Sequence, residues 1–203
     1  MASPNTMAYI LVIMRGCSGS GKSTRVNQLI SERISLWPLS KTAVFSTDDF
    51  WLVPDPVNPS DLIYKHDISR LSEAHVWNQA RAINAMQSRS ADYIVIDNTN
   101  LCRWEAKPYV EAAIRHNFSV EVYEPQTPWW IARDPDELFA RSTHGVPHDA
   151  ILKMLERYET DFSIDAILAS SLPQRNNNRN NRNNSQAFNR NNNNFNNNRS
   201  FKK

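Results

Sequence analysis

The stretch "YILVIMRGCSGSGKST", residues 9–24, decides the fold of this chain. It opens on an apolar run, Tyr9–Met14, that has the length and composition of a buried strand. Four residues behind the run match the spacing G-x-x-x-x-G-K-[ST]: Gly16, Gly21, Lys22 and Ser23. Apolar residues then recur at helical spacing from Val26 to Ile34. A strand, a glycine-rich loop and a helix in this order predict a phosphate-binding P-loop.

Backbone chemistry explains why such a loop would hold phosphate. Glycines let the chain fold into a nest of inward-pointing N–H groups, and the following helix adds partial positive charge at its N-terminus. We expect eight residues to line the nucleotide site: Gly16, Ser18, Gly19, Ser20, Gly21, Lys22, Ser23 and Thr24. Lys22 would reach the β- and γ-phosphates, and the Ser23 hydroxyl would ligate Mg²⁺. The expected cofactors are ATP or GTP with Mg²⁺; a glycine-rich turn with an incidental lysine is the alternative.

The composition predicts a soluble, unsecreted protein. The longest apolar run has eight residues, whereas a membrane-spanning helix needs roughly 18 to 20. No basic residue precedes that run as a signal peptide would require, so we expect an intracellular protein of the cytoplasm or nucleus without a membrane partner. Cys17 and Cys102, the two cysteines, fit a reducing compartment and are interpreted as packing thiols.

The rest of the chain predicts an α/β fold, because short apolar runs alternate with amphipathic segments. The expected class is a P-loop NTPase-type three-layer sandwich with a mostly parallel central sheet and a helical lid. Further strands are predicted at 43–46, 93–97 and 118–124, and helices at 22–34, 68–86, 104–115 and 134–171, the last broken at 144–147. Residues 52–64, rich in proline and asparagine, are expected to form a loop.

The composition changes near Leu172, which divides the chain into a kinase domain at 1–172 and a tail at 173–203. The tail holds fifteen Asn among 31 residues, five Arg, two Lys and no acid. It therefore carries +7, and the 16 remaining basic residues against 21 acids leave the domain about −5. Such a segment is expected to be disordered and suited to nucleic acid through arginines interleaved with Phe188, Phe195 and Phe201. A solubilising extension is the alternative.

Two acids stand where predicted strands end. Asp48 follows the second strand and Asp97 ends the third. Ligands of open α/β sheets bind beyond the carboxyl ends of the strands, so both side chains should face the nucleotide. Asp48 is the candidate general base that takes the proton of an attacking alcohol. Asp97 would hold a Mg²⁺-bound water or position the base, although a helix cap is the alternative for it, and a solvated turn or cap for Asp48 and Asp49.

Phosphoryl transfer also needs positive charge on the transferring oxygens. Arg133 and Arg141 follow the last predicted strand. The segment "DPDELFARSTHGVP", residues 134–147, begins like a helix and ends at a Gly-Pro break, as a lid would. Arg141 is the candidate lid arginine; an exposed helix residue without a role in the reaction is the alternative.

Five motifs in this order resemble the P-loop polynucleotide 5′-hydroxyl kinases: "GCSGSGKST", "STDDF", "VIDNTN", "EPQTPWW" and "ELFARSTHGVP". The likeness covers Ile10–Glu159 and is strongest to the kinase domains of animal ubiquitin-ligase-binding (Nedd-binding) proteins. It implies that Lys22 and Ser23 take the phosphate and metal roles. It also implies that Asp48 is the general base and that Arg141 contacts the donor phosphates. Family members use one of two adjacent positions, here Asp97 and Asn98, for a second acid, and we place Asp97 first.

The chain departs from this family at two positions. Trp51 stands where phage-type members have an arginine that grips a phosphate of the acceptor strand, and Ser142 stands where an asparagine is usual. Trp51 would either stack on the terminal base or pack under the loop. These changes leave the phosphoryl chemistry in place and bear on the choice of acceptor.

The sequence therefore predicts a kinase that moves the γ-phosphate of ATP or GTP to the 5′-hydroxyl end of RNA or DNA. One alternative keeps the P-loop kinase and changes the acceptor to a small molecule or protein. Another is a nucleotide-binding adaptor module that has lost turnover, which the changes at Trp51 and Ser142 favour. The sequence pattern favours no particular oligomeric state.

Overall fold

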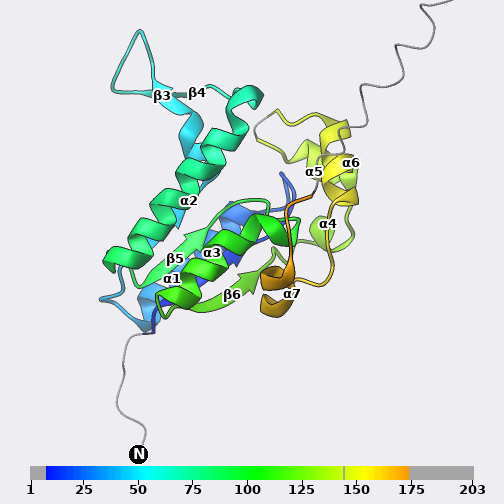
Figure 1. Ribbon diagram of the computed structural model, residues 1–203. Coiled ribbons are helices and arrows are strands. Elements are labelled where there is room, and N and C mark those ends of the chain that lie inside the picture. The colour runs from blue at the N-terminus through cyan, green and yellow to red at the C-terminus, as the bar shows by residue number, and fades with distance from the viewer. Residues whose placement is uncertain (1–7, 144, 174–203) are drawn as a thin grey trace, which may run out of the picture. The chain divides into compact units, whose positions relative to one another are not determined.

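The computed structural model describes residues 8–143 and 145–173 (Figure 1). Its strands are β1 (Ile10–Met14), β2 (Thr42–Phe45), β3 (Leu52–Pro54), β4 (Leu62–Tyr64), β5 (Tyr93–Ile96) and β6 (Ser119–Tyr123). Its α-helices are α1 (Lys22–Leu36), α2 (Leu71–Ser88), α3 (Arg103–Arg115), α4 (Pro128–Ile131), α5 (Pro135–Ala140), α6 (His148–Glu156) and α7 (Ile164–Ala169). Two 3-10 helices are η1 (Thr47–Trp51) and η2 (Ile68–Arg70). The predicted tail lies outside the described residues, apart from Pro173, and so does His144.

The central sheet is parallel and has the strand order β2-β5-β1-β6. β1 lies between β5 and β6, with Val12 opposite Val95 on one side and Glu121 on the other. β2 pairs in parallel with the far edge of β5. All four strands therefore run in one direction, and their carboxyl ends meet at the same edge of the sheet. This confirms the predicted parallel sheet.

Alternate residues of β1 pack against different layers of helices. Leu11 and Ile13 belong to a buried cluster with residues of α2, α3 and α7. Val12 and Met14 pack on the other face, against Val26 and other apolar side chains of α1. Strand side chains alternate between faces, so this pattern gives the predicted three-layer α/β sandwich. In the part of the chain that the structure describes, no helix combines the length and apolar character needed to cross a bilayer.

The prediction of a loop at 52–64 was wrong, because the segment contains the antiparallel hairpin β3–β4. Leu52 pairs with Tyr64, Val53 with Ile63 and Pro54 with Leu62. Proline is tolerated here because a two-stranded sheet has two outer edges, where a strand needs no N–H donor. The hairpin follows directly on η1.

The C-terminal part is more broken than its helical pattern predicts. Residues 134–171 form three helices, α5, α6 and α7, separated at 141–147 and at 157–163. Asp134 caps α5 by accepting from two backbone N–H groups, and Ser163 caps α7 in the same way from Ala166. The short helix α4, whose cap is Thr127, was not predicted. Side-chain caps explain where α4, α5 and α7 begin, whereas α6 begins after Pro147 without one.

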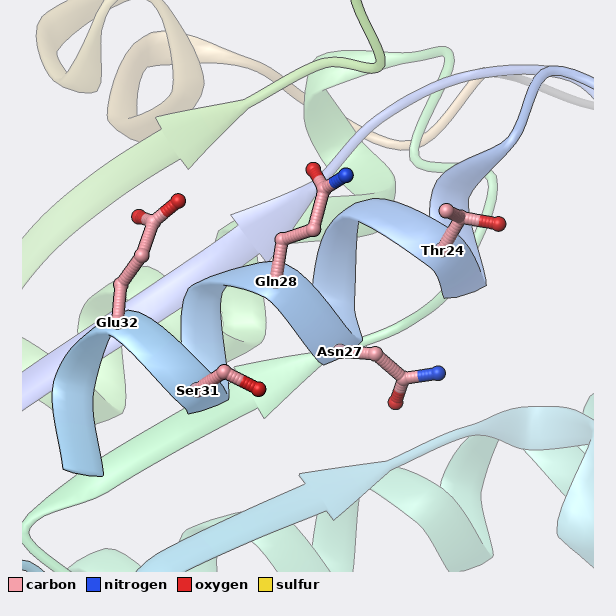
Figure 2. Close-up of a pocket in the computed structure, with 5 residues that line it drawn as sticks. All are labelled: Thr24, Asn27, Gln28, Ser31 and Glu32. Atoms are coloured by element: carbon pink, nitrogen blue, oxygen red, sulfur yellow. The ribbon is translucent and has the colours of Figure 1, made fainter. Parts of the chain in front are cut away.

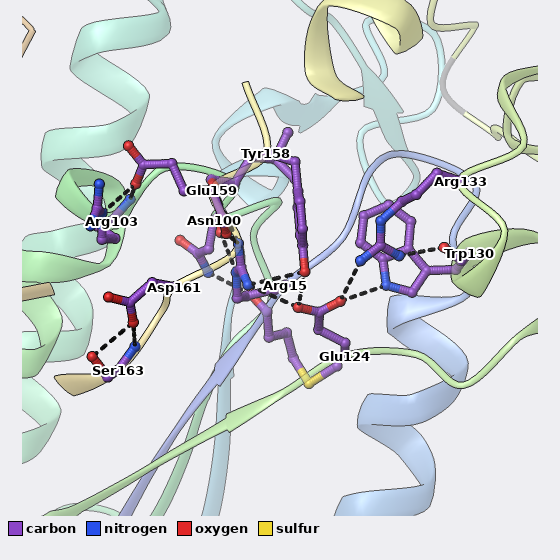
Figure 3. Close-up of polar contacts among 12 residues, drawn as sticks. Arg15, Asn100, Arg103, Glu124, Trp130, Arg133, Tyr158, Glu159, Asp161 and Ser163 are labelled. Carbon is purple, nitrogen blue, oxygen red and sulfur yellow. Dashed lines mark hydrogen bonds and ion pairs between the residues drawn. The ribbon is translucent and has the colours of Figure 1, made fainter. Parts of the chain in front are cut away.

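A buried arginine ties the end of β1 to distant parts of the chain (Figure 3). The Arg15 side chain is 2% exposed, and its Nη1 lies 2.9 Å from Oε1 of Glu124, just beyond β6. Its Nη2 donates to the Glu159 carbonyl at 2.6 Å, and its guanidinium lies 4.4 Å from the centre of the Tyr158 ring. Burial lowers the pKa of Arg15, while Tyr158 and Glu124 oppose that shift. The buried cation is thus compensated by an anion, carbonyl oxygens and aromatic faces.

Arg15→Met is expected to lower the free energy of unfolding by about 3 kcal/mol, because it removes one partner of a buried ion pair. Removal of one partner of a buried ion pair costs about 3–5 kcal/mol. We expect the low end of this range because Glu124 still has Arg133, at 3.2 Å, as a second cation. Urea unfolding measures the change. Arg25→Met is the matched control: its bridge to Glu32 is more exposed and should contribute less than about 1 kcal/mol. Equal losses in the two variants would contradict the assigned role of Arg15.

Candidate active site

The loop between β1 and α1 has the backbone of a phosphate nest. Gly16, Gly19 and Gly21 have φ values of 138°, 76° and 95°. These values lie where L-residues with a side chain are rarely found. A Cβ at Gly16 would meet Ser20 Oγ at 2.6 Å, and one at Gly19 would meet the Leu138 carbonyl oxygen at 2.0 Å. The loop therefore has no room for a side chain at Gly16, and α5 packs directly against it at Gly19.

Lys22 and Ser23 begin α1 at the edge where the sheet strands end. Lys22 Nζ donates to the Cys17 carbonyl at 2.9 Å, so the ammonium folds back over its own loop. Ser23 Oγ donates to Asp97 Oδ2 at 3.2 Å. Asp97 follows β5, which neighbours β1 in the sheet. The structure thus brings together the predicted phosphate, metal and acid positions.

Electrostatics couple these groups to Asp48. Burial lowers the pKa of Lys22, and the negative charges of Asp97 and Asp48 oppose that shift. Burial raises the pKa of Asp97; Lys22 and the Ser23 hydrogen bond oppose this, and Asp48 and Asp49 add to it. Three carboxylates and one ammonium therefore share this edge of the sheet, and perturbed titration of this kind is typical of functional sites.

The two adjacent acids after β2 have different partners. Asp48 and Asp49 lie in η1, where the Ser46 hydroxyl accepts from the Asp48 N–H at 3.2 Å. Asp49 Oδ2 lies 3.0 Å from Nη1 of Arg81, on α2. Asp48 Oδ1 accepts a hydrogen bond of 3.2 Å from the hydroxyl of Tyr64, on β4. Asp49 thus takes part in an ion pair, while Asp48 stays within electrostatic reach of Lys22.

Asn98 has a structural role that separates it from Asp97. Its Oδ1 accepts from the Thr47 N–H at 2.9 Å, and its Nδ2 donates to the Tyr109 hydroxyl at 3.5 Å. Asn98 therefore holds the start of η1 against α3. Asp97 faces Ser23 and Lys22 instead. The geometry favours Asp97 over Asn98 as the acid of the site.

The residues could hold a Mg²⁺ ion. Ser23 Oγ and Asp97 Oδ2 present two oxygens, and the buried Asp97 Oδ1 has no hydrogen-bond partner among the described residues. Mg²⁺ prefers oxygen ligands, commonly one or two protein groups with phosphate and water. No group of three or more His, Cys, Asp or Glu side chains that could hold a metal occurs in residues 8–143 and 145–173. The oxygens at Ser23 and Asp97 fit the magnesium that the sequence predicts.

The predicted lid arginine contacts Glu137 and Trp129. Arg141 Nη2 pairs with Glu137 Oε2 at 2.8 Å, and its guanidinium lies 3.9 Å from the centre of the Trp129 ring. Trp129 Nε1 donates to the Gly19 carbonyl at 3.0 Å. Arg141 is thus connected to the phosphate loop through one intervening ring. It is half exposed and lies at the end of α5, and its ion pair with Glu137, four positions earlier, is weak.

Ser142 contacts the phosphate loop directly. Its hydroxyl lies 2.7 Å from that of Ser18. The Thr127 hydroxyl also reaches the loop, donating to the Ser20 carbonyl at 2.9 Å. Thr127, Trp129 and Ser142 were not predicted as loop contacts, although the motif "EPQTPWW" was a signal that the first two lie near the site. The segment around α4 and α5 therefore packs against one side of the loop.

Two candidates from the sequence, one aromatic residue and one arginine, have structural roles. Trp51 is 2% exposed and packs edge-on against Phe50 and His66, so it does not offer a face to a nucleic-acid base. The packing interpretation of Trp51 is confirmed. Arg133 pairs with Glu124 at 3.2 Å and lies over the Trp130 ring, which takes it away from the phosphate site. Its role is to complete the network around Arg15 (Figure 3).

The remaining loop residues differ in exposure. Ser20 is buried, and its Oγ has no partner among the described residues. Thr24 lies on the outer side of α1, where it lines a shallow hollow of about 470 Å³ with polar residues of the same helix (Figure 2). The other lining residues are Asn27, Gln28, Ser31 and Glu32. Cys17 is buried, and burial raises the pKa of its thiol to about 11, which suits packing rather than nucleophilic chemistry.

Known proteins are similar to this chain in sequence. The family model described as an AAA domain matches residues 11–161. NEDD4-binding protein 2 of Homo sapiens is 39% identical over 169 residues, which make up 83% of this chain and 9% of that protein. The chain therefore corresponds to a small part of this relative.

Two solved structures match at low identity. The Pnkp1/Rnl/Hen1 RNA repair complex matches with 18% identity and a TM-score of 0.49, over 77% of this chain and 46% of that chain. The APS kinase CysC of Mycobacterium tuberculosis, in complex with AMPPNP and APS, matches with 18% identity and a TM-score of 0.42, over 70% of this chain and 78% of that chain.

Gly19→Ala is expected to disturb the loop, because the new Cβ would meet the Leu138 carbonyl at 2.0 Å. Binding of a fluorescent ATP analogue should weaken at least tenfold, since the N–H groups that would face phosphate must shift. Gly145→Ala is the matched control: Gly145 also has a positive φ, of 61°, but a Cβ there meets nothing within 4 Å. That variant should show only the roughly 1 kcal/mol of backbone strain. Unchanged nucleotide affinity in Gly19→Ala would contradict the assigned contact.

Proposed function

The chain belongs to the AAA domain family, and on that premise we propose that it is a kinase for the 5′-hydroxyl ends of RNA or DNA, with ATP or GTP as donor. The observation that carries the proposal is the convergence of Lys22, Asp97 and Asp48 at one edge of the parallel sheet. A phosphate nest alone would serve any nucleotide-binding protein. A carboxylate within electrostatic reach of the phosphate-binding lysine adds a group that accepts a proton from an alcohol.

The proposed reaction assigns one step to each group. The loop N–H groups and Lys22 hold the β- and γ-phosphates of the donor. Asp48 takes the proton of the 5′-hydroxyl while that oxygen forms a bond to the γ-phosphorus. The bond between the γ-phosphorus and the β–γ bridging oxygen breaks, and the nucleoside diphosphate leaves. Asp48 later releases its proton to water.

Other residues of this edge would support the transfer. A Mg²⁺ ion held at Ser23, with Asp97 beside it, would neutralise charge on the β- and γ-phosphate oxygens. Arg141 would move its guanidinium from Glu137 to the donor phosphates, since phosphate is the stronger partner for a bidentate donor. Trp129 would keep that side chain close to Gly19 before the nucleotide binds.

Two sequence features support a polynucleotide as the acceptor. The order of motifs between Gly16 and Pro147 resembles that of the 5′-hydroxyl kinases. The tail at 173–203 carries +7 beside a domain of about −5, so we propose that the tail attracts the polyanion. We place the domain boundary at 172/173 for the same reason.

Asp48→Asn is expected to lower kcat by about 10²–10⁴-fold, because the amide cannot accept the proton. Transfer of radiolabelled γ-phosphate from ATP to 5′-hydroxyl RNA and DNA oligonucleotides measures the rate. Asp49→Asn serves as the control, since its carboxylate is paired with Arg81, and it should stay within about tenfold of wild type.

The acceptor panel also tests the rival functions. Labelling of nucleosides or sugars with no labelling of oligonucleotides would favour a small-molecule kinase. Nucleotide binding without transfer to any acceptor would favour an adaptor module. Equal activity of Asp48→Asn and wild type would remove Asp48 from the mechanism.

Deletion of 173–203 is expected to raise KM for long oligonucleotides severalfold at low salt and to leave kcat for short ones unchanged, because phosphate contacts by basic residues drive capture. A full-length variant with the seven basic tail residues changed to Gln separates charge from length. Both variants should lose their difference from wild type at high salt. Equal KM of the full and truncated chains at low salt would contradict a role in capture.

A further inference from the structure

Two consecutive carbonyl groups of the phosphate loop accept hydrogen bonds from side chains outside it. The Ser20 carbonyl accepts from the Thr127 hydroxyl at 2.9 Å, and the Gly19 carbonyl accepts from Trp129 Nε1 at 3.0 Å. The donors lie 107 and 110 positions further along the chain, in and just before α4. The sequence pattern assigned no role to either donor.

The Thr127 hydroxyl joins the start of α4 to the loop. It caps α4 by accepting from the Trp130 N–H at 3.3 Å, and it donates its own proton to the Ser20 carbonyl. The methyl group of Thr127 also lies beside the loop, because a Cβ on Gly21 would meet Thr127 Cγ2 at 3.0 Å. Thr127 therefore lies against both residues of the peptide group that joins Ser20 to Gly21, and its hydroxyl acts as donor and acceptor at once.

A donor that holds a carbonyl also sets the direction of an N–H. The peptide group is planar and trans, so its C=O and N–H bonds point in opposite directions. Because the Ser20 carbonyl points to Thr127, the Gly21 N–H of the same peptide group points away from Thr127. This N–H has no acceptor within residues 8–143 and 145–173. It is therefore a donor that a ligand of the loop can use.

The preceding peptide group follows the same rule. Its carbonyl, that of Gly19, points to Trp129, so the Ser20 N–H points the other way. There it donates to the Cys17 carbonyl at 3.2 Å, within the loop. Both N–H groups thus lie on the side of the loop opposite to the two side-chain donors.

We propose that Thr127 and Trp129 are positioning residues for the donor triphosphate: they hold two loop carbonyls outward and so direct the N–H groups of the same peptide groups toward phosphate. This inference rests on the nucleotide-binding part of the proposed function and requires no particular acceptor. A hydrogen bond to a carbonyl also polarises its peptide group, so the N–H becomes a stronger donor. Neither side chain carries a charge, and both therefore act on phosphate only through the loop backbone.

Thr127→Val tests the first contact, because it replaces the hydroxyl with a methyl group and keeps the shape of the side chain. Loss of one hydrogen bond to the loop should weaken binding of a fluorescent ATP analogue about threefold to tenfold. Thr127→Ser keeps the hydroxyl and should bind within about twofold of wild type. The anisotropy of the analogue measures the affinity.

Trp129→Phe tests the second contact and leaves every helix cap in place. It removes the indole N–H and keeps an aromatic face for Arg141, whose guanidinium lies 3.9 Å from the centre of the Trp129 ring. The affinity should again fall about threefold to tenfold. The variant with both substitutions should bind more weakly than either single variant, because each substitution releases a different peptide group.

Ser163→Ala is the matched control for the lost helix cap. The Ser163 hydroxyl caps α7 by accepting from the Ala166 N–H at 3.3 Å, and it donates to Asp161 Oδ1 at 2.9 Å. It thus has the same two roles as the Thr127 hydroxyl, at the same two distances, but its partners are not in the loop. This variant should lose resistance to urea much as Thr127→Val does and should keep the wild-type affinity for the analogue.

A second readout follows the loop amides directly. The chain has four glycines, of which three lie in the loop and the fourth is Gly145. In protein labelled with ¹⁵N-glycine, the assigned Gly21 amide proton should move downfield when AMPPNP and Mg²⁺ bind, because an N–H bound to an anionic oxygen is deshielded. This movement at saturation should be smaller in Thr127→Val and equal to wild type in Ser163→Ala, which a loss of stability alone would not produce. The Gly145 signal is the internal reference.

The outcomes separate this inference from the proposed function. Weaker binding in Thr127→Val and Trp129→Phe, with wild-type binding in Thr127→Ser and Ser163→Ala, supports the positioning role. Wild-type affinity in both Thr127→Val and Trp129→Phe, or an equal loss in Ser163→Ala, overturns it. If Thr127→Val does not fold, Trp129→Phe decides. Wild type that binds the analogue and labels no 5′-hydroxyl end removes the proposed function and leaves this inference, whereas wild type that binds no nucleotide overturns both.

Discussion

The structure depends on a buried cation at the point where the central strand becomes the phosphate loop. Arg15 is always charged in a protein, so its 2% exposure requires compensation within hydrogen-bonding distance. The compensating groups come from far along the chain: the carboxylate of Glu124 is 109 positions away, and the carbonyl of Glu159 is 144 positions away. The loop therefore reaches its position only when β6 and the segment after α6 are folded in place. Local propensity favours the strand β1 and the helix α1, and the ion pair between Arg15 and Glu124 positions the loop between them.

The same carboxylate connects the loop to the segment that precedes Arg141, the predicted lid arginine. Glu124 Oε1 accepts from Arg15 and from the Tyr158 hydroxyl, and its Oε2 accepts from Trp130 Nε1 and Arg133 (Figure 3). The neighbouring ring, Trp129, then donates to the loop carbonyl of Gly19. One anion thus helps to hold both the start of the loop and α4 in place. The close approach of α5 to Gly19 follows from this arrangement, and only a glycine leaves room for it.

The sequence was informative wherever a pattern was continuous or a position was set by topology. β1, the loop and α1 are consecutive, so their order was readable, and the places of Asp48 and Asp97 were predictable because parallel strands end at one edge. The hairpin was missed because strands of three residues are too short to show a period of two. The burial of Trp51 was not readable either, since an aromatic residue after a strand fits both a core and a stacking surface. The sequence did not distinguish Arg133 from Arg141. The ion pair with Glu124 shows that Arg133 has a structural role.

Asp48 and Asp49 have identical side chains, but the backbone geometry of η1 gives them different partners. Successive side chains of a 3-10 helix point about 120° apart, so neighbours cannot share one environment. Asp49 therefore reaches Arg81 on α2, while Asp48 reaches Tyr64 and the field of Lys22. If η1 were extended, its side chains would alternate by about 180°, and Asp48 would lose either the hairpin or the loop. A short, tight turn after β2 is thus the element that brings one carboxylate both within electrostatic reach of Lys22 and within hydrogen-bonding distance of the Tyr64 hydroxyl.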